Sequence, residues 1–468
     1  MSDRKNFFYY LLPSIVSSLV GIATIPITTY FLDPKDFGVY AILSAFVMPV
    51  VALSTTGVSW VLGGHFYKTE GDDNRSLIFN ILFFDFIFKS FWILLLWFLS
   101  PLLLPWLVNG YQAGYSLFFK LSLVTILLST FTASISYALV LKREAKKHAV
   151  VEITGPIVSA TVTILCLYVL KLTTISLFLG PLGAEIASVL IGLWFVRNSI
   201  KINLDKKWFR EIIKVGLPSM PLELVNLLSN ISDKYFVQRF MNLSSLGIYS
   251  HSTNYKSVFS LGFKAFNRVF APHVLEGFSN ENEIKIAKLK KQLVKWIGLA
   301  GIGGIFVSLF SKEVVNILSH GKFIEAAPLV PLWYLLIFFM GFGTTYQQFL
   351  FVRKKSLYLT ISGVFTGVIS IGLIALGAAK FGMMGAVVAA LLANLVTQLS
   401  FKIYARKLGC ASMGESRIFA MAASVFLVYL ANILVDFNLI SRVIIAVLLS
   451  VVVAIVCGLH KTQGTLEN

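Results

Sequence analysis

The chain has 468 residues, of which 57% are hydrophobic and 13% are charged, and its formal net charge is +18. The hydrophobic share corresponds to about thirteen membrane spans of roughly 20 residues, and the charged share is about half that of a soluble domain. These values exclude a soluble globular domain, a disordered chain and a disulfide scaffold, and they predict an all-α integral membrane protein. The cysteines Cys166, Cys410 and Cys457 stand singly in or beside apolar stretches and are interpreted as packed thiols.

Fourteen apolar stretches, separated by charged or turn-rich breaks, are long enough to predict transmembrane helices. In chain order they cover 7–31, 38–64, 77–104, 115–141, 150–170, 176–196, 215–238, 246–275, 293–310, 328–352, 357–379, 382–404, 416–436 and 440–459. An even number of spans places both termini on the same side of the membrane.

Basic residues are distributed unequally between the two sets of connections. Of the 40 Lys and Arg residues, 26 belong to the side that includes both termini, counting Lys402 and Arg417 at span ends, and 7 belong to the other side, counting Arg442 at a span end. This asymmetry follows the positive-inside rule and predicts cytoplasmic termini. The net charge is therefore explained by topology and by contact with anionic lipid headgroups rather than by a nucleic-acid partner.

An internal repeat with an offset of about 202 to 210 residues divides the chain. Leu12-Pro13-Ser14 recurs as Leu217-Pro218-Ser219, Gly38-Val39-Tyr40 as Gly247-Ile248-Tyr249, Arg143 as Arg353, and Gly180–Ala184 as Gly382–Ala386. Because six spans separate the copies, both have the same orientation, and the repeat is parallel. We predict two six-helix lobes around a central cavity, comprising an N-lobe of residues 1–200, a cytoplasmic linker of 201–214, a C-lobe of 215–410, and two additional helices with a tail in 411–468.

Paired prolines mark the first helix of each lobe. Pro13 and Pro26 lie in the first span, and Pro218 and Pro221 lie in the seventh. Proline removes a backbone donor and permits bending, so these two helices are the predicted hinges.

Three basic residues of the eighth span, Lys256, Lys264 and Arg268, fall within about 120° of one helical face. Lys256 lies about 15 Å from the outer end of that helix, close to the middle of the membrane. Since a cation at this depth is costly in hydrocarbon, we predict that the face lines a water-filled cavity and binds an anionic headgroup. The alternatives are a structural ion pair or, for Arg268, snorkelling to the membrane surface.

Other charged residues within the spans are candidates for substrate binding or ion coupling. Asp85 and Lys89 have the i, i+4 spacing of a helical ion pair, which favours a structural role. Asp233 and Lys234 are adjacent and point in different directions, so one of them is expected to find a partner elsewhere. Lys89 and Lys234 join the basic substrate-binding candidates. The ion-coupling candidates, for Na⁺ or H⁺, are Glu223, Asp233, Asp85 and Glu185.

Motifs for catalysis and for energy from ATP are missing from the sequence. There is no Gly-x-x-x-x-Gly-Lys-Ser/Thr phosphate loop, no His-Glu-x-x-His and no paired-cysteine metal spacing. No outward connection exceeds about 17 residues, which is too short for an extramembrane catalytic domain. We therefore expect no enzyme, no cofactor and no resident metal, and instead movement of a molecule across the bilayer driven by an ion gradient or by the membrane potential.

Several motifs together resemble those of bacterial polysaccharide flippases, of the O-antigen type, in the multidrug/oligosaccharidyl-lipid/polysaccharide exporter superfamily. They are Leu12-Pro13-Ser14, Gly38-Val39-Tyr40, Gly57-Val58-Ser59-Trp60, His65-Phe66-Tyr67, Asp233-Lys234, Gly247-Ile248-Tyr249-Ser250 and Gly382-Met383-Met384-Gly385-Ala386. The resemblance implies export of an undecaprenyl-pyrophosphate-linked oligosaccharide from the cytoplasmic to the outer leaflet by alternating access. It further implies a bacterial inner-membrane location and the polysaccharide polymerase machinery as a partner. His65 departs from the arginine that such sequences often carry.

Two related transporters stay open as alternatives, and an enzyme is disfavoured. A peptidoglycan-precursor flippase would need the same cationic lumen for the same lipid pyrophosphate. A cation-coupled multidrug exporter would need acids near the middle of the membrane, whereas basic residues predominate there in this chain. A membrane polymerase or ligase would need a large outer loop.

Overall fold

The computed structural model describes residues 2–55, 61–62, 66, 71–279, 283–353, 355–410, 412–435 and 437–457. Within these ranges all regular structure is helical, and each of the fourteen predicted spans coincides with a helical segment. Among the described residues, ten helices are long and apolar enough to cross a membrane. The prediction of an all-α membrane protein is confirmed.

The chain divides into two compact units, Met1–Ser250 and His251–Asn468. The first unit contains α1 (Ser2–Phe31), α2 (Pro34–Thr55), α4 (Gly71–Leu107), α5 (Tyr115–Leu141), α6 (Ala145–Tyr168), α7 (Ser176–Val196), the 3₁₀ turn η1 (Arg197–Ser199), α8 (Lys206–Phe240) and the first turns of α9 (Leu243–Ser279). The second contains the rest of α9, α10 (Glu283–Ser319), the 3₁₀ turn η2 (Ile324–Ala326), α11 (Leu329–Val352), α12 (Ser356–Lys407), α13 (Glu415–Val435) and α14 (Leu439–Val456).

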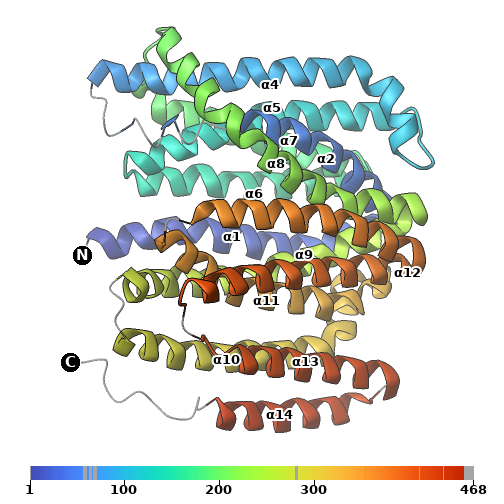
Figure 1. Cartoon of the computed structure of the whole chain (residues 1–468). Helices are drawn as coiled ribbons and strands as arrows, with labels where there is room; N and C mark the ends of the chain where they lie inside the picture. Colours follow the sequence, from blue (N-terminus) through green and yellow to red (C-terminus); the bar gives the residue numbers. More distant parts are fainter. Residues whose placement is uncertain are drawn as a thin grey trace. The chain divides into compact units, whose positions relative to one another are not determined.

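Helices within each unit pack side by side (Figure 1). In the first unit α6 packs against α7 and α1, and α4 packs against α5. In the second unit α11 packs against α12, and α10 against α13 and α14. The predicted limits of the N-lobe (1–200), the linker (201–214) and the C-lobe (215–410) stay a prediction.

The predicted linker contributes directly to the first unit. α8 begins at Lys206, where the Asp205 carboxylate caps the helix by accepting from the Lys207 amide at 2.8 Å. The preceding extended segment is held to α4, since Asn80 donates to the Asn203 carbonyl at 2.6 Å and accepts from the Asp205 amide at 2.9 Å. The basic segment is therefore anchored by partly buried polar contacts at Asn203 and Asp205.

One helix break agrees with the predicted spans and one helix start differs from them, both for local reasons. α12 is interrupted at Gly382, whose φ of 59° and ψ of −142° suit glycine alone, and the interruption falls between the predicted spans 357–379 and 382–404. α10 begins at Glu283 rather than at residue 293. Acidic residues at the start of this segment favour the helix N-terminus, so the lysine-rich stretch forms the first turns of a membrane helix.

The repeated glycines make a reciprocal contact inside the first unit. A Cβ atom on Gly38 of α2 would lie 1.8 Å from the Leu243 carbonyl oxygen, and one on Gly247 of α9 would lie 1.7 Å from the Pro34 carbonyl oxygen. The two contacts involve equivalent positions of the repeat, because an offset of 209 residues relates Gly38 to Gly247 and also relates Pro34 to Leu243. The two contacts are therefore equivalent under the internal repeat, and only glycine permits so close an approach.

Candidate functional site

α9 carries two of the lysines predicted to bind substrate. Lys256 is half-buried, and its ammonium lies 4.6 Å from the centre of the Trp333 ring on α11, a cation–π geometry. Trp333 is buried and held in place, because its indole N–H donates to the Ser252 hydroxyl at 2.8 Å. Lys264, two turns further along, is exposed. The side chain of Arg268 lies outside the described residues.

An aromatic cavity of about 280 Å³ lies between α9, α10 and α11 of the second unit, and its lining on α9 begins at Val258, two residues after Lys256. Six of its lining residues are aromatic, namely Phe259, Phe263, Phe266, Trp296, Tyr334 and Phe342. The Tyr334 hydroxyl donates to the Ala300 carbonyl and is thereby satisfied. This cavity is not evident from the sequence alone. The spacing of Phe259, Phe263 and Phe266 on one helical face is the signal that points to it.

Asp85 and Lys89 form the predicted ion pair in α4. The Lys89 ammonium lies 3.1 Å from Asp85 Oδ2, and both side chains are 2% exposed. Asp85 Oδ1 makes no hydrogen bond to the described residues. The two charges are fully enclosed and neutralise one another, an arrangement that favours the structural interpretation of this pair.

Asp233 has its partner within the first unit. Its Oδ2 accepts from the Tyr249 hydroxyl of α9 at 3.0 Å, and its Oδ1 accepts from the Lys234 amide at 2.7 Å. The Lys234 side chain is half-buried on the same helix, α8. Tyr249 belongs to the repeated Gly-x-Tyr motif, so Asp233 helps to fix the start of α9 where Gly247 meets α2.

Glu185 and Glu223 differ in what surrounds them. Glu185 on α7 is half-buried and accepts from the Thr132 hydroxyl of α5 at 2.7 Å. Nearby, the Ser136 hydroxyl donates to Glu152 Oε1 at 2.5 Å and lies 2.9 Å from His148 Nδ1. Glu185 thus belongs to a polar network between α5, α6 and α7. Glu223 lies in α8, and its side chain is outside the described residues.

The predicted hinge prolines lie within continuous helices. Pro13 and Pro26 are interior to α1, where Pro13 is buried and Pro26 is half-buried. Pro218 and Pro221 fall within α8, and their side chains are outside the described residues, as are the Gly57–Trp60 motif and His65. Whether these helices bend during transport stays a prediction.

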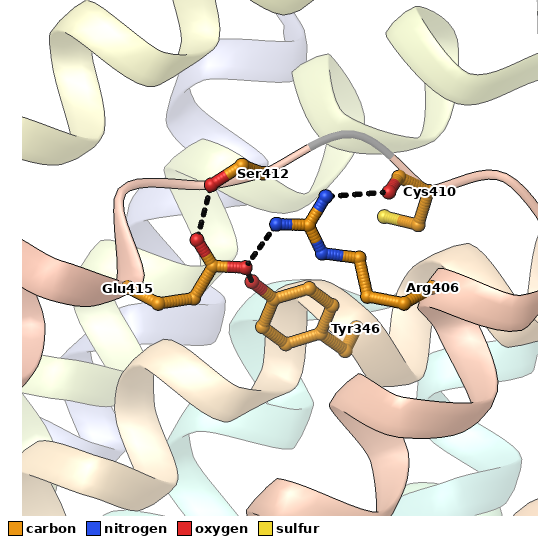
Figure 2. Close-up of polar contacts among 5 residues, drawn as sticks. All are labelled: Tyr346, Arg406, Cys410, Ser412 and Glu415. Carbon is orange, nitrogen blue, oxygen red and sulfur yellow. Dashed lines mark hydrogen bonds and ion pairs between the residues drawn. The ribbon is translucent and has the colours of Figure 1, made fainter.

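A polar cluster joins the C-terminal ends of α11 and α12 to the N-terminal end of α13 (Figure 2). The sequence predicts that these ends face the cytoplasm. Glu415 Oε1 accepts from the Tyr346 hydroxyl at 2.7 Å and from Arg406 Nη2 at 3.1 Å, while the Ser412 hydroxyl donates to Oε2. Arg406 Nη1 donates to the Cys410 carbonyl at 3.4 Å. The cluster is not evident from the sequence, because Arg406 and Glu415 are brought together by the connection between α12 and α13, in which Gly409 and Gly414 have positive φ.

We expect Glu415→Ala to lower the free energy of unfolding by about 2 to 3 kcal/mol, because it leaves the Tyr346 hydroxyl without its acceptor. Tyr346→Phe removes one hydrogen bond and should cost about 1 kcal/mol. Arg406→Ala should cost less than about 1 kcal/mol, since the Arg406 side chain is 42% exposed and its ion pair is screened. Thermal unfolding in detergent measures all three, and an equal loss for Arg406→Ala and Glu415→Ala would contradict this order.

The three cysteines are free and buried, in accord with the interpretation as packed thiols. Burial raises the pKa of the Cys410 thiol to about 11, so this thiol stays protonated at neutral pH. In the described part of the chain no three His, Cys, Asp or Glu residues are grouped so as to hold a metal ion.

What the described residues do provide is a cation, Lys256, and an apolar cavity on adjacent turns of α9, which suits binding of an amphiphile.

Solved structures with this fold are membrane transporters. The chain is similar to the lipid II flippase MurJ in an inward closed conformation, with 12% identity, a TM-score of 0.75, and coverage of 96% of this chain and 98% of that one. It is also similar to an inward-facing multidrug resistance MATE family transporter of the MOP superfamily, with 13% identity, a TM-score of 0.62, and coverage of 89% and 95%. A mutant of the Vibrio cholerae MATE transporter VcmN aligns at 12% identity with a TM-score of 0.57 and coverage of 86% and 96%. The class is therefore a multi-pass membrane protein with the MurJ/MATE fold.

A family model described as polysaccharide biosynthesis protein matches residues 27–328. The chain belongs to this polysaccharide biosynthesis protein family, as its motifs predict. None of the curated protein sequences matches the chain significantly.

Proposed function

We propose that the protein moves an undecaprenyl-pyrophosphate-linked oligosaccharide from the cytoplasmic to the outer leaflet of the bacterial inner membrane, for synthesis of a surface polysaccharide such as O-antigen. The observation that carries the proposal is the pair Lys256 and Lys264 on α9, which the sequence predicts to span the membrane, in a polysaccharide biosynthesis family member. A pyrophosphate needs cationic partners to replace its hydration, and an ammonium at the interface of two helices provides one. We place both termini in the cytoplasm on the distribution of basic residues.

The membrane potential is the driving force that we propose for this step. A pyrophosphate carries about two negative charges, and an outward crossing in a cell that is negative inside is favourable. At about 2.3 kcal/mol per charge per 100 mV, two charges gain about 4.6 kcal/mol. Coupling to Na⁺ or H⁺ through Glu185, Asp233 or Glu223 would add to this, and Asp85, being paired with Lys89, is the least suited of the four candidates.

The test is flipping of a fluorescent undecaprenyl-pyrophosphate oligosaccharide in proteoliposomes, at zero and at imposed potential. We expect Lys256→Ala and Lys264→Ala each to slow flipping by about tenfold or more, as loss of one charge-assisted contact of about 1.5 to 3 kcal/mol implies. Lys256→Arg should retain most of the rate, and Lys171→Ala, which changes an exposed lysine of the α6–α7 connection, serves as the matched control. Equal rates for all variants, or wild-type export of cationic dyes in place of the lipid, would overturn the proposal.

A lipid II flippase is the second candidate, favoured by the fold similarity to MurJ over nearly the whole chain. Its substrate would engage the same lysines through the same lipid pyrophosphate. Competition decides between them, because unlabelled lipid II should inhibit flipping of the labelled oligosaccharide lipid only if the protein accepts it. Efficient flipping of lipid II itself, with no flipping of the oligosaccharide lipid, would assign the protein to peptidoglycan synthesis.

A further inference from the structure

We propose that the aromatic cavity between α9, α10 and α11 binds the first isoprene units of a polyprenyl phosphate, next to Lys256, which binds the phosphate. The inference rests on the proposed function, and it assigns to the cavity the hydrocarbon part of that substrate. Its ligand class is a single branched, unsaturated chain that carries a phosphate or pyrophosphate at its end.

The chemistry of the cavity matches a hydrocarbon. Six aromatic rings line it, and the Tyr334 hydroxyl is already bonded to the Ala300 carbonyl. An apolar cavity of about 150 Å³ stays dry and binds benzene, so the volume of about 280 Å³ accommodates roughly twelve carbon atoms, or about two isoprene units. Polarisable double bonds and methyl branches suit a lining of ring faces and edges.

The position of Lys256 selects a chain attached directly to a phosphate. Lys256 precedes the cavity-lining Phe259 by three residues, or about 4.5 Å along α9. Its ammonium lies on the ring of Trp333 in α11, a helix that also contributes Tyr334 and Phe342 to the cavity lining. Cation and cavity therefore share two helices, and one ligand with adjacent anionic and apolar parts satisfies both. A glycerophospholipid places a glycerol and two chains beyond its phosphate and fits this arrangement less well.

The cavity is accessible on the side of α9 and α10. Trp296 and Leu299 of its lining are 39% and 50% exposed. Gly262, also in the lining, has no neighbouring atom within 4 Å of the position that a Cβ would take. A larger side chain at this position therefore enters the cavity opening without a backbone clash.

The experiment is photolabelling of the full chain in lipid nanodiscs, with undecaprenyl phosphate that carries a diazirine near the phosphate, followed by mapping of labelled peptides. We expect labels on residues 258–266 and 296–300, displaced by unlabelled undecaprenyl phosphate and not by the same amount of phosphatidylglycerol. Gly262→Leu should reduce this labelling by about tenfold. Gly372→Leu, which changes a helical glycine of α12 that is equally open, should leave it unchanged.

Three results overturn the inference while leaving the proposed function intact: labelling confined to other helices, equal displacement by phosphatidylglycerol, or full labelling of Gly262→Leu. A different result would overturn the proposed function alone: the cavity is labelled as expected, but the wild-type protein flips no oligosaccharide lipid in proteoliposomes. The proposed function then fails and the polyprenyl site stands. Size-exclusion profiles of both leucine variants check that each remains folded.

Discussion

Gly38→Ala is expected to lower the free energy of unfolding by about 1 to 3 kcal/mol, the cost of overpacking a closed contact. The added methyl group would lie 1.8 Å from the Leu243 carbonyl oxygen, a backbone atom that cannot rotate away, so α2 and the start of α9 must separate. Gly247→Ala meets the Pro34 carbonyl in the same way and should have an effect of similar size. Unfolding of purified protein in detergent, followed by tryptophan fluorescence, measures the change.

Gly21→Ala is the matched control for this prediction. Gly21 lies in α1 with no atom within 4 Å of its Cβ position, and alanine in an open helical position stabilises by about 0.5 to 1 kcal/mol. The two substitutions are chemically identical, yet they should change stability in opposite directions, because a backbone carbonyl blocks the added methyl group at Gly38 and nothing blocks it at Gly21. Stabilisation by Gly38→Ala as well would show that α2 and α9 do not approach one another as closely as the structure places them.

Lys89→Met is expected to be the most destabilising single change, with a loss of about 3 to 5 kcal/mol. It leaves the buried Asp85 carboxylate without its ion-pair partner. Asp85→Leu likewise leaves the buried Lys89 ammonium without a counter-charge. The double variant Asp85→Leu/Lys89→Met replaces the pair by hydrophobic side chains of similar size. It should unfold within about 1 to 2 kcal/mol of the wild type, because neither charge then remains buried.

Flipping activity distinguishes a structural pair from a substrate-binding lysine in this series. If the pair is structural, the double variant regains both stability and the rate of transport. If Lys89 contacts the pyrophosphate, the double variant regains stability alone. Additive losses in the two single variants, with no recovery in the double variant, would contradict the coupling that the 3.1 Å contact implies.

Several features of the fold follow from local sequence pattern. Apolar runs of about 20 residues have no stable alternative to helices in a bilayer, since every backbone donor and acceptor must be satisfied within the segment. The break at Gly382 is equally local, because glycine alone adopts its backbone conformation at no cost. The Asp85–Lys89 pair is also local, as the i, i+4 spacing places the two side chains on one helical face.

The candidate site is less predictable, because its contacts join residues that are distant in the chain. Helical depth identifies Lys256 as a costly charge, yet its location on Trp333 depends on how α9 packs against α11. The partner of Asp233 is a tyrosine from the next helix, and the partners of Glu415 come from three different segments. Sequence spacing carries no information about such pairs, since their distances are set by helix packing.

By itself, the sequence determined the class of this protein, its helices, its internal repeat and its family, because each depends on the polarity or order of residues along one segment. Tertiary structure alone decided that Gly38 and Gly247 meet reciprocal carbonyls, and that aromatic side chains from three helices enclose a cavity next to Lys256. The physical reason is that hydrophobicity is summed along the chain, whereas close packing and electrostatic pairing depend on atoms that only the folded chain brings within a few ångströms.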